Sequence, residues 1–362
     1  MRIVIFTADI GEGHDLPARV LRDAIAERRP DAEVMILDAL RTAGPLARAM
    51  VRSGSEFILE RLPWLFDVQF WLVGRLRPTR ALAGWLAELL AAKRLLAAIE
   101  QHRADVVVCT YPVANDVLSR QRRRGRLTVP VVSAITDLAA LRYWAHPDCD
   151  LHLVIHPESA PEIREIAGPD AAVLHVRGLT SADYERPVDR TAARLELGLP
   201  RTGPVVAVSG GGWGVGDLVG AVRAALRVAP DVHVVALCGR NEAARTRLER
   251  LYSGDTRVLV LGFTDRMSDV LAASDVLVHS TAGLTVLEAL VRGARVISYG
   301  WGVGHIRINN RAYRRFGLAD VVTDRHELGP AITRALASPL SPDIAYGELP
   351  SAAEAVLALA ES

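Results

Sequence analysis

The sequence predicts two doubly wound α/β domains in tandem. Strand-like runs rich in Val, Ile and Leu alternate with longer helical patterns along most of the 362 residues. Each run is continuously apolar, which is typical of parallel strands covered by helices on both faces. The length agrees with two domains, because soluble domains usually have roughly 100–200 residues.

The predicted strands fall into two sets. The first set is Ile3–Thr7, Val34–Asp38, Asp105–Cys109, Val131–Ile135 and Leu151–Ile155. The second set is Val205–Ser209, Val232–Leu237, Val258–Leu261, Val276–His279 and Val296–Ser298. Helical patterns such as Asp217–Val228 and Thr285–Arg292 fill the gaps, as a right-handed crossover between parallel strands requires.

The domain boundary is predicted in the polar segment from Ser181 to Gly203. Pro187 and Pro200 punctuate this segment as turn residues. We therefore expect an N-terminal domain over residues 1–186 and a C-terminal domain over residues 187–349.

Composition excludes several protein classes. The 43 basic and 42 acidic residues give a formal charge of +1, whereas a nucleic-acid binder normally has a strong basic excess. Half of the residues are hydrophobic, yet no run of about 20 apolar residues could span a bilayer. The N-terminus resembles a buried strand more than a signal peptide. Three scattered cysteines suit a reducing compartment, so we expect a cytoplasmic protein.

The loops that follow the strands are the expected ligand sites, because open α/β sheets bind ligands at the carboxyl ends of their strands. The first such loop is Thr7–His14. Its glycines permit tight turns, and His14 stands where a strand passes into a helix. A histidine there can take a proton from an attacking hydroxyl, or it can simply cap the helix.

Two further loops suit an anionic ligand. Ser209–Gly216 is rich in glycine and lies between a strand and a helix, where main-chain N–H groups and the helix N-terminus favour phosphate. It lacks the lysine of a P-loop, and a plain flexible turn is the alternative. Val278–Thr285 has the same setting, followed by Glu288, whose carboxylate could accept both hydroxyls of a ribose or could complement the helix dipole.

The stretch Leu46–Ala98 concentrates aromatic and basic residues. It contains half of all Trp and Phe, and eight basic residues against four acidic ones. Such a face suits an interface with anionic lipid, although amphipathic helices packed on the sheet would give the same pattern.

Five motifs, taken in order, resemble the processive diacylglycerol glycosyltransferase and monogalactosyldiacylglycerol synthase family, which is related to the MurG-type transferases. These motifs are Gly11-Glu12-Gly13-His14, Thr136-Asp137-Leu138 with Trp144-Ala145-His146, Cys238-Gly239-Arg240-Asn241-Glu242, Gly262-Phe263-Thr264 with Met267, and Ala282-Gly283-Leu284-Thr285 with Glu288. The resemblance covers nearly the whole chain. It implies the GT-B fold, in which two Rossmann-like domains face each other across a cleft, with the C-terminal helix (residues 350–362) packing back on the first domain.

The resemblance also implies a nucleotide-sugar donor, UDP-linked, held by the C-terminal half. The implied donor-binding residues are Gly211, Gly212, Trp213, Arg240, Phe263, Thr264, Met267, Ala282, Gly283, Leu284, Thr285, Glu288, His305 and Asn309. The acceptor would meet Gly11, Gly13, Asp137 and Trp144, with His14 as the general base. No metal and no cofactor beyond the donor are expected, because glycine amides and helix dipoles would stabilise the leaving diphosphate.

Three departures from the family pattern bear on specificity. Leu141 stands where the family has a histidine, and His305 and Ile306 replace the Gln-Glu pair that would contact the sugar. From the resemblance as a whole we expect an inverting hexosyltransferase acting on a lipid hydroxyl such as that of diacylglycerol, peripheral on the inner face of the cell membrane. The alternatives are a soluble transferase for a small natural product, a UDP-sugar epimerase, or a binding protein that has lost turnover.

Overall fold

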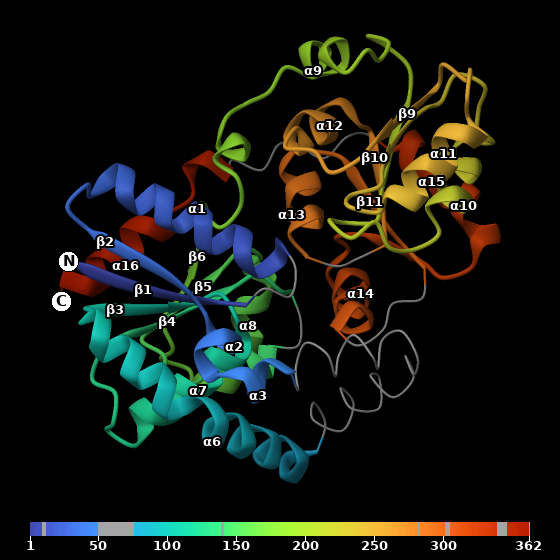
Figure 1. Ribbon diagram of the computed structural model, residues 1–362. Coiled ribbons are helices and arrows are strands. Elements are labelled where there is room, and N and C mark those ends of the chain that lie inside the picture. Colours follow the sequence, from blue (N-terminus) through green and yellow to red (C-terminus); the bar gives the residue numbers. More distant parts are fainter. Residues whose placement is uncertain are drawn as a thin grey trace. The chain divides into compact units, whose positions relative to one another are not determined.

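The computed structural model describes residues 1–8, 12–49, 76–138, 141–280, 283–300, 305–338 and 346–361 (Figure 1). The chain divides into two compact units. Unit 1 contains the described residues of Met1–Ala182, Val303–His305 and Leu349–Ser362, and unit 2 contains those of Asp183–Gly302 and Ile306–Glu348.

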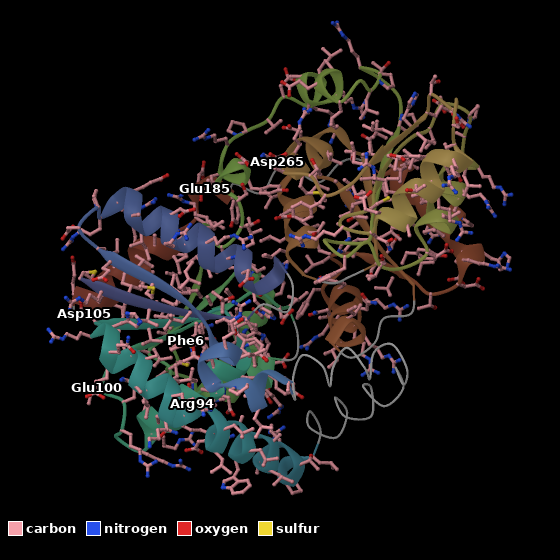
Figure 2. The ribbon with its side chains drawn as sticks, viewed as in Figure 1. Phe6, Arg94, Glu100, Asp105, Glu185 and Asp265 are labelled. Atoms are coloured by element: carbon pink, nitrogen blue, oxygen red, sulfur yellow. The ribbon has the colours of Figure 1, made fainter. Side chains whose placement is uncertain are left out.

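Unit 1 is built on a six-stranded parallel sheet with the order β2-β1-β3-β4-β5-β6. Its strands are β1 (Arg2–Thr7), β2 (Glu33–Asp38), β3 (Val106–Cys109), β4 (Val131–Ile135), β5 (Leu151–Val154) and β6 (Val173–His175). Residues Ile3 to Phe6 and the whole of β3 are buried, as expected for strands covered on both faces. Figure 2 shows Phe6 in the interior of the unit, whereas Asp105 lies at the outer end of the strands.

Helices cover both faces of this sheet (Figure 1). One face carries α1 (Glu12–Arg28) and α16 (Ala352–Glu361), which pack together. The other carries α2 (Ala39–Ala43), α6 (Arg77–His102) and α7 (Pro112–Arg123). The remaining elements are α3 (Pro45–Arg48), η2 (Leu141–Tyr143), η3 (Pro157–Ser159) and α8 (Ala160–Ala167).

Helix α16 completes unit 1 although it comes from the far end of the chain. It packs against α1, and two ion pairs, Arg28–Glu354 at 3.1 Å and Arg29–Glu361 at 2.7 Å, connect the two helices. Because these pairs are solvent-exposed, the apolar contacts of Ala352, Ala353 and Val356 supply most of the attachment.

Unit 2 has a second six-stranded parallel sheet, with the order β12-β11-β10-β7-β8-β9. Its strands are β7 (Val205–Ser209), β8 (His233–Leu237), β9 (Val258–Leu261), β10 (Val276–His279), β11 (Arg295–Tyr299) and β12 (Asp320–Val322). One face packs against α10 (Leu218–Leu226), α11 (Glu242–Leu251) and α15 (Arg325–Ala337), and the other against α12 (Met267–Ala273) and α13 (Leu284–Val291) (Figure 1). The remaining elements are η4 (Ala182–Glu185), α9 (Arg190–Glu196), α14 (His305–Phe316) and η5 (Tyr346–Glu348).

The predicted fold class is confirmed in both units. In each sheet the strand order reverses beside the first strand, between β1 and β3 in unit 1 and between β7 and β10 in unit 2. At such a point the loops from neighbouring strands leave in opposite directions and open a crevice for ligands. The predicted glycine-rich loops follow β1, β7 and β10.

The units separate at Ala182/Asp183, four residues before the predicted boundary at residue 187. The segment after Asp183 belongs to unit 2 because two of its arginines, Arg190 and Arg194, attach it there. The Arg194 guanidinium is 4% exposed and donates to the carbonyl oxygen of Ala273 at 2.9 Å and to Asp275 at 3.0 Å. Arg190 pairs with the same carboxylate at 2.6 Å.

None of the described helices has the length and apolar content needed to cross a membrane. Of the aromatic and basic stretch Leu46–Ala98, residues 50–75 lie outside the described part of the chain. Its C-terminal part forms most of α6.

Candidate functional site

His14 lies in the first turn of α1, at the carboxyl end of β1. Its Nδ1 is 2.8 Å from the carbonyl oxygen of Thr110, which follows β3. A carbonyl only accepts, so Nδ1 carries the proton and the neutral ring has its basic lone pair on Nε2. The ring also packs edge-on against Tyr111, with centroids 5.5 Å apart, and at a tilt to Trp144 at 5.9 Å. These contacts orient the imidazole as a general base would need.

The Thr136-Asp137 and Trp144 motif lies beside His14. The indole Nε1 of Trp144 donates to Asp137 at 3.0 Å, and the Thr136 hydroxyl donates to the Gly13 carbonyl oxygen at 3.3 Å. The structure does not show Trp144 on an open acceptor path. Its side chain is 1% exposed, and it packs in a core cluster with Leu141 beneath the histidine.

The glycine-rich loop after β7 has a rigid backing in unit 2. The main-chain N–H of Arg240 donates to the Gly212 carbonyl oxygen at 2.9 Å, and the Asn241 side chain donates to the Gly214 carbonyl oxygen at 3.1 Å. Gly239 must be a glycine because its φ is +54° and a Cβ there would lie 2.5 Å from the Gly211 carbonyl oxygen. The Cys238–Asn241 motif therefore shapes the loop that holds Gly211 and Gly212. Trp213 lies on the loop with 60% of its side chain exposed.

The loop after β10 meets the same glycine-rich loop. Ser280 donates to the Val215 carbonyl oxygen at 2.6 Å, and a Cβ at Gly216 would lie 2.6 Å from Ser280. Gly283 begins α13, and its main-chain N–H donates to the Tyr313 hydroxyl at 3.3 Å.

The remaining residues predicted around this loop lie on α13 or outside the description. Leu284, Thr285 and Glu288 lie on α13, with Glu288 only 6% exposed. Ala282 lies outside the described residues, as does Gly11 of the loop after β1.

The predicted base-binding residues include an arginine guanidinium stacked on an aromatic ring. The Arg240 guanidinium carbon is 4.1 Å from the Phe263 ring centroid, and the ring is 55% exposed. Thr264 accepts from the main-chain N–H of Arg266 at 3.1 Å and so fixes the turn into α12, which begins at Met267. An exposed aromatic ring backed by a guanidinium suits stacking on a planar base.

Helix α14 carries the residues predicted near the donor sugar, and the structure describes the side chains of only some of them. Asn309 is buried at 1% exposure, and Ile306 is half-buried. Helix α14 begins at His305, whose side chain lies outside the description. The neighbouring Asn310 accepts from the Ser298 hydroxyl at 2.7 Å, which fixes the helix on β11.

Four residues at strand ends of unit 1 were missed by the sequence analysis. Thr110 and Tyr111 follow β3, and their position at a strand end was the available signal. His156 and His175 lie where β5 and β6 end. Burial, and then the neighbouring His175, lower the pKa of His156 to about 4, against the opposing effect of Asp137. His156 is therefore neutral at physiological pH.

The residues Asp148, Cys149 and Asp150 form an Asp-x-Asp sequence, whose two carboxylates have a structural role. Asp148 and Asp150 of the Asp-x-Asp segment pair with Arg123 at 2.7 Å and Arg122 at 2.6 Å. Within the described ranges, no group of three or more His, Cys, Asp or Glu residues is arranged to hold a metal ion.

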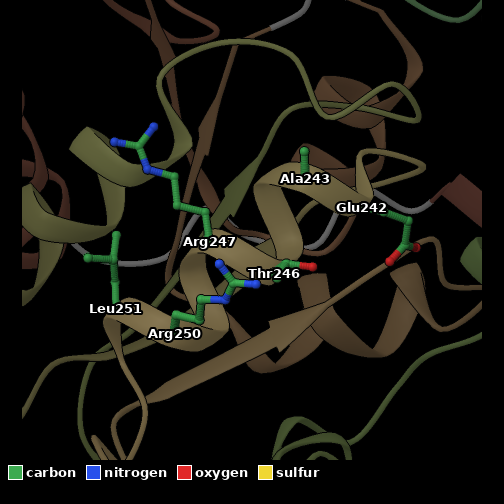
Figure 3. A pocket seen from close by; sticks show the side chains of 6 residues that line it. All are labelled: Glu242, Ala243, Thr246, Arg247, Arg250 and Leu251. Atoms are coloured by element: carbon green, nitrogen blue, oxygen red, sulfur yellow. The ribbon is translucent and has the colours of Figure 1, made fainter.

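A hollow of about 680 Å³ lies over the outer face of α11, as Figure 3 shows. It is lined by Glu242, Ala243, Thr246, Arg247, Arg250 and Leu251. None of the predicted donor-binding residues lines it.

Family models match both halves of the chain. Residues 14–179 match the monogalactosyldiacylglycerol (MGDG) synthase model, and residues 205–310 match the glycosyltransferase family 28 C-terminal domain. The first match begins at His14, and the second covers the loops after β7 and β10 and the predicted base-binding residues around Phe263. The chain is a GT-B glycosyltransferase. The resemblance drawn from the motifs is thereby confirmed.

Known proteins agree with this assignment at low identity. The processive diacylglycerol beta-glucosyltransferase of Bacillus pumilus is 24% identical over 336 residues, covering 90% of this chain and 84% of that protein. The fold is that of MurG from Acinetobacter baumannii, with a TM-score of 0.61 and 14% identity over 100% of this chain and 99% of that one. The glycosyltransferase SnogD from Streptomyces nogalater gives a TM-score of 0.56 and 16% identity over 99% of both chains.

Proposed function

We propose that this glycosyltransferase moves a hexosyl group from a UDP-sugar to a hydroxyl of a lipid acceptor such as diacylglycerol, with inversion and without a metal. The observation that carries the proposal is the fixed tautomer of His14 beside the Trp144–Asp137 pair, in a unit matched by the MGDG synthase model. The relatives named as diacylglycerol glucosyltransferases support the acceptor class.

The donor would bind to unit 2. The Arg240–Phe263 pair offers a stacking surface for uracil, and the interlocked loops after β7 and β10 present main-chain amides to the diphosphate. The N-terminus of α13 adds a favourable dipole for an anion, so the leaving diphosphate is stabilised by groups already in place. The proposed step therefore requires no metal.

The acceptor would be activated by His14. Nε2 takes the proton of the acceptor hydroxyl while its oxygen bonds to the anomeric carbon of the sugar. The bond from that carbon to the diphosphate oxygen breaks, and UDP leaves with the electron pair. A single displacement of this kind inverts the anomeric configuration. The Thr110 carbonyl oxygen then accepts a hydrogen bond from the imidazolium that forms.

An apolar stripe on α6 supports attachment to a membrane surface. Four large side chains at i, i+3, i+4 and i+7 are between 38% and 66% exposed, namely Leu82, Trp85, Leu86 and Leu89. The acid within this stretch, Glu88, faces inward, where it accepts from Gln121 at 2.7 Å and pairs with Arg124. Lys93, one turn beyond Leu89, is exposed. Apolar residues beside an exposed base suit an anionic lipid surface.

The enzymatic proposal is tested by incubating the protein with UDP-sugars and extracted lipids and reading the products by mass spectrometry. We expect a glycolipid from the wild-type protein and a loss of about 10²–10⁴-fold in rate for His14→Gln, with UDP affinity unchanged by calorimetry. Glycosylation of small phenolic acceptors but no lipid would instead assign the natural-product alternative. Conversion of the UDP-sugar alone would assign an epimerase.

The membrane proposal has a separate test. Trp85→Glu is expected to reduce co-sedimentation with phosphatidylglycerol vesicles, because it places a charge in the apolar stripe. Leu251→Glu is the matched control, since Leu251 is 51% exposed on α11 of the other unit. Equal binding by the two variants would refute the assignment of the α6 stripe.

A further inference from the structure

Tyr184 has a buried hydroxyl with no hydrogen-bond partner among the residues that the structure describes. The residue lies in η4, at the start of unit 2, and its side chain is 3% exposed. Buried hydroxyls are normally satisfied, because an unpaired one loses its bonds to water without replacement. An unsatisfied hydroxyl at such a place calls for a ligand or a reason in the fold.

The fold holds the tyrosine ring firmly in place. The guanidinium carbon of Arg292, at the end of α13, lies 5.1 Å from the ring centroid. The same guanidinium donates to the carbonyl oxygens of Asp183 at 2.5 Å and Arg186 at 2.7 Å, on either side of the tyrosine. It also donates to the Ser268 hydroxyl at 2.6 Å, on α12. The position of the Tyr184 hydroxyl is therefore imposed by several contacts that do not involve it.

The charged group that acts most strongly on this hydroxyl is Glu288. Glu288 precedes Arg292 by one turn of α13, where the Arg292 main-chain N–H donates to the Glu288 carbonyl oxygen at 3.2 Å. Burial and then the Glu288 charge raise the pKa of the Tyr184 phenol well above its usual value, so the phenol is protonated and is a donor. The hydroxyl and the carboxylate nevertheless form no hydrogen bond with each other.

We propose that Tyr184 is a ribose-binding residue of the donor site, and that one ribose hydroxyl of the donor bridges its phenol to the Glu288 carboxylate. A ribose hydroxyl both donates and accepts, whereas the carboxylate only accepts and the protonated phenol can donate. One sugar hydroxyl can therefore donate to Glu288 and accept from Tyr184, which gives the phenol the partner that it lacks among the described residues. This inference rests on the proposed UDP-sugar donor, whose ribose is expected at Glu288.

The test compares UDP with 2′-deoxy-UDP and 3′-deoxy-UDP by calorimetry on the wild-type protein and on Tyr184→Phe. Phenylalanine keeps the ring beneath Arg292 and removes only the hydroxyl. We expect UDP to bind about tenfold more weakly to Tyr184→Phe, which corresponds to ~1.4 kcal/mol. The deoxy nucleotide that lacks the bridging hydroxyl should bind both proteins equally. Tyr252→Phe, at the C-terminal end of α11, is the matched control and should leave all affinities unchanged.

The unfolding temperature without nucleotide gives an independent measurement. Because the hydroxyl has no partner among the described residues, Tyr184→Phe should unfold at the wild-type temperature or above it. Equal UDP affinity of Tyr184→Phe and wild type would overturn the inference and leave the proposed function intact. An equal loss for UDP and for both deoxy nucleotides would also overturn it. Failure of the wild-type protein to bind UDP would overturn both proposals.

Discussion

Replacing Gly214 by alanine should weaken donor binding through the shape of the glycine-rich loop. A Cβ at this position would point directly at the Cys238 carbonyl oxygen, 2.7 Å from Cβ of Asn241 and 2.9 Å from the Cys238 carbonyl carbon. Ordinary carbon contacts are about 3.5–4.0 Å, so the loop has to move by about 1 Å. Such a shift breaks the hydrogen bonds from Arg240 N–H to Gly212 at 2.9 Å and from the Asn241 side chain to Gly214 at 3.1 Å.

The magnitude follows from those two bonds. At about 0.5–1.5 kcal/mol each, restoring the wild-type loop costs about 1–3 kcal/mol. If UDP binds only the wild-type arrangement, its affinity falls by about 5- to 150-fold.

The control is Gly254→Ala. The φ of Gly254 is positive, +85°, as is that of Gly214, +58°, but a Cβ at Gly254 would meet nothing within 4 Å. It therefore carries the same backbone strain, roughly 1–2 kcal/mol, without the collision. Calorimetric titration with UDP, together with thermal unfolding, separates loss of affinity from loss of folding. Affinities of the two variants that agree within about twofold would refute the reasoning.

Three further perturbations have defined outcomes. Arg194→Met removes a buried guanidinium and should lower the unfolding free energy of unit 2 by about 3–5 kcal/mol in urea titrations. Arg190→Met loses one partly exposed ion pair and should lower it by about 1 kcal/mol. Equal losses in the two variants would contradict the argument from burial. The pKa of His156 is about 4 in the folded chain and about 6.5 in the unfolded chain. Its neutral form therefore contributes its full stability above pH 6.5, and this contribution is lost as the pH falls towards 4. His156→Asn should make the fall in unfolding free energy between these pH values shallower, and an unchanged slope would exclude this histidine as its source. Trp144→Phe removes the indole N–H that donates to Asp137 and should lower the unfolding temperature of unit 1 without changing the affinity for UDP. A large drop in UDP affinity would contradict this and would show that Trp144 affects nucleotide binding directly.

The long apolar strands were predictable because their side chains are buried on both faces. The predicted runs Ile3–Thr7 and Val131–Ile135 agree with β1 and β4 within one residue. The strands β6 and β12 were missed, since each has only three residues and includes His175 or Asp320. A run this short lacks the periodicity on which such a prediction depends.

Residues of the candidate site could be predicted where a single loop shows a recognisable sequence pattern. The residues that hydrogen-bond to them from distant elements could not be predicted. His14 follows a strand and two glycines, which marks it in the sequence. Thr110, whose carbonyl oxygen fixes the His14 tautomer, lies 96 residues away and contributes only its backbone. The family signature at Cys238–Asn241 was recognisable as a motif, but its hydrogen bonds to the loop at Gly212 and Gly214 depend on the pairing of β7 with β8.

The departure at Leu141 also has a physical account. This leucine is 1% exposed and packs with Trp144 and Ile163. An apolar side chain fits that cluster without the hydrogen bonds that a buried histidine would need. The loss of the family histidine is therefore compatible with a well-packed core beneath His14.

The attachment of residues 183–203 to unit 2 has a consequence for exchanging domains between related enzymes. Arg292 binds the carbonyl oxygens of Asp183 and Arg186, and Asp275 accepts from both Arg190 and Arg194. A chimera joined at Gly203 would supply these groups from a foreign sequence and would disturb the base of α12 and α13. A chimera joined before Asp183 would transfer the donor unit together with the segment that completes it.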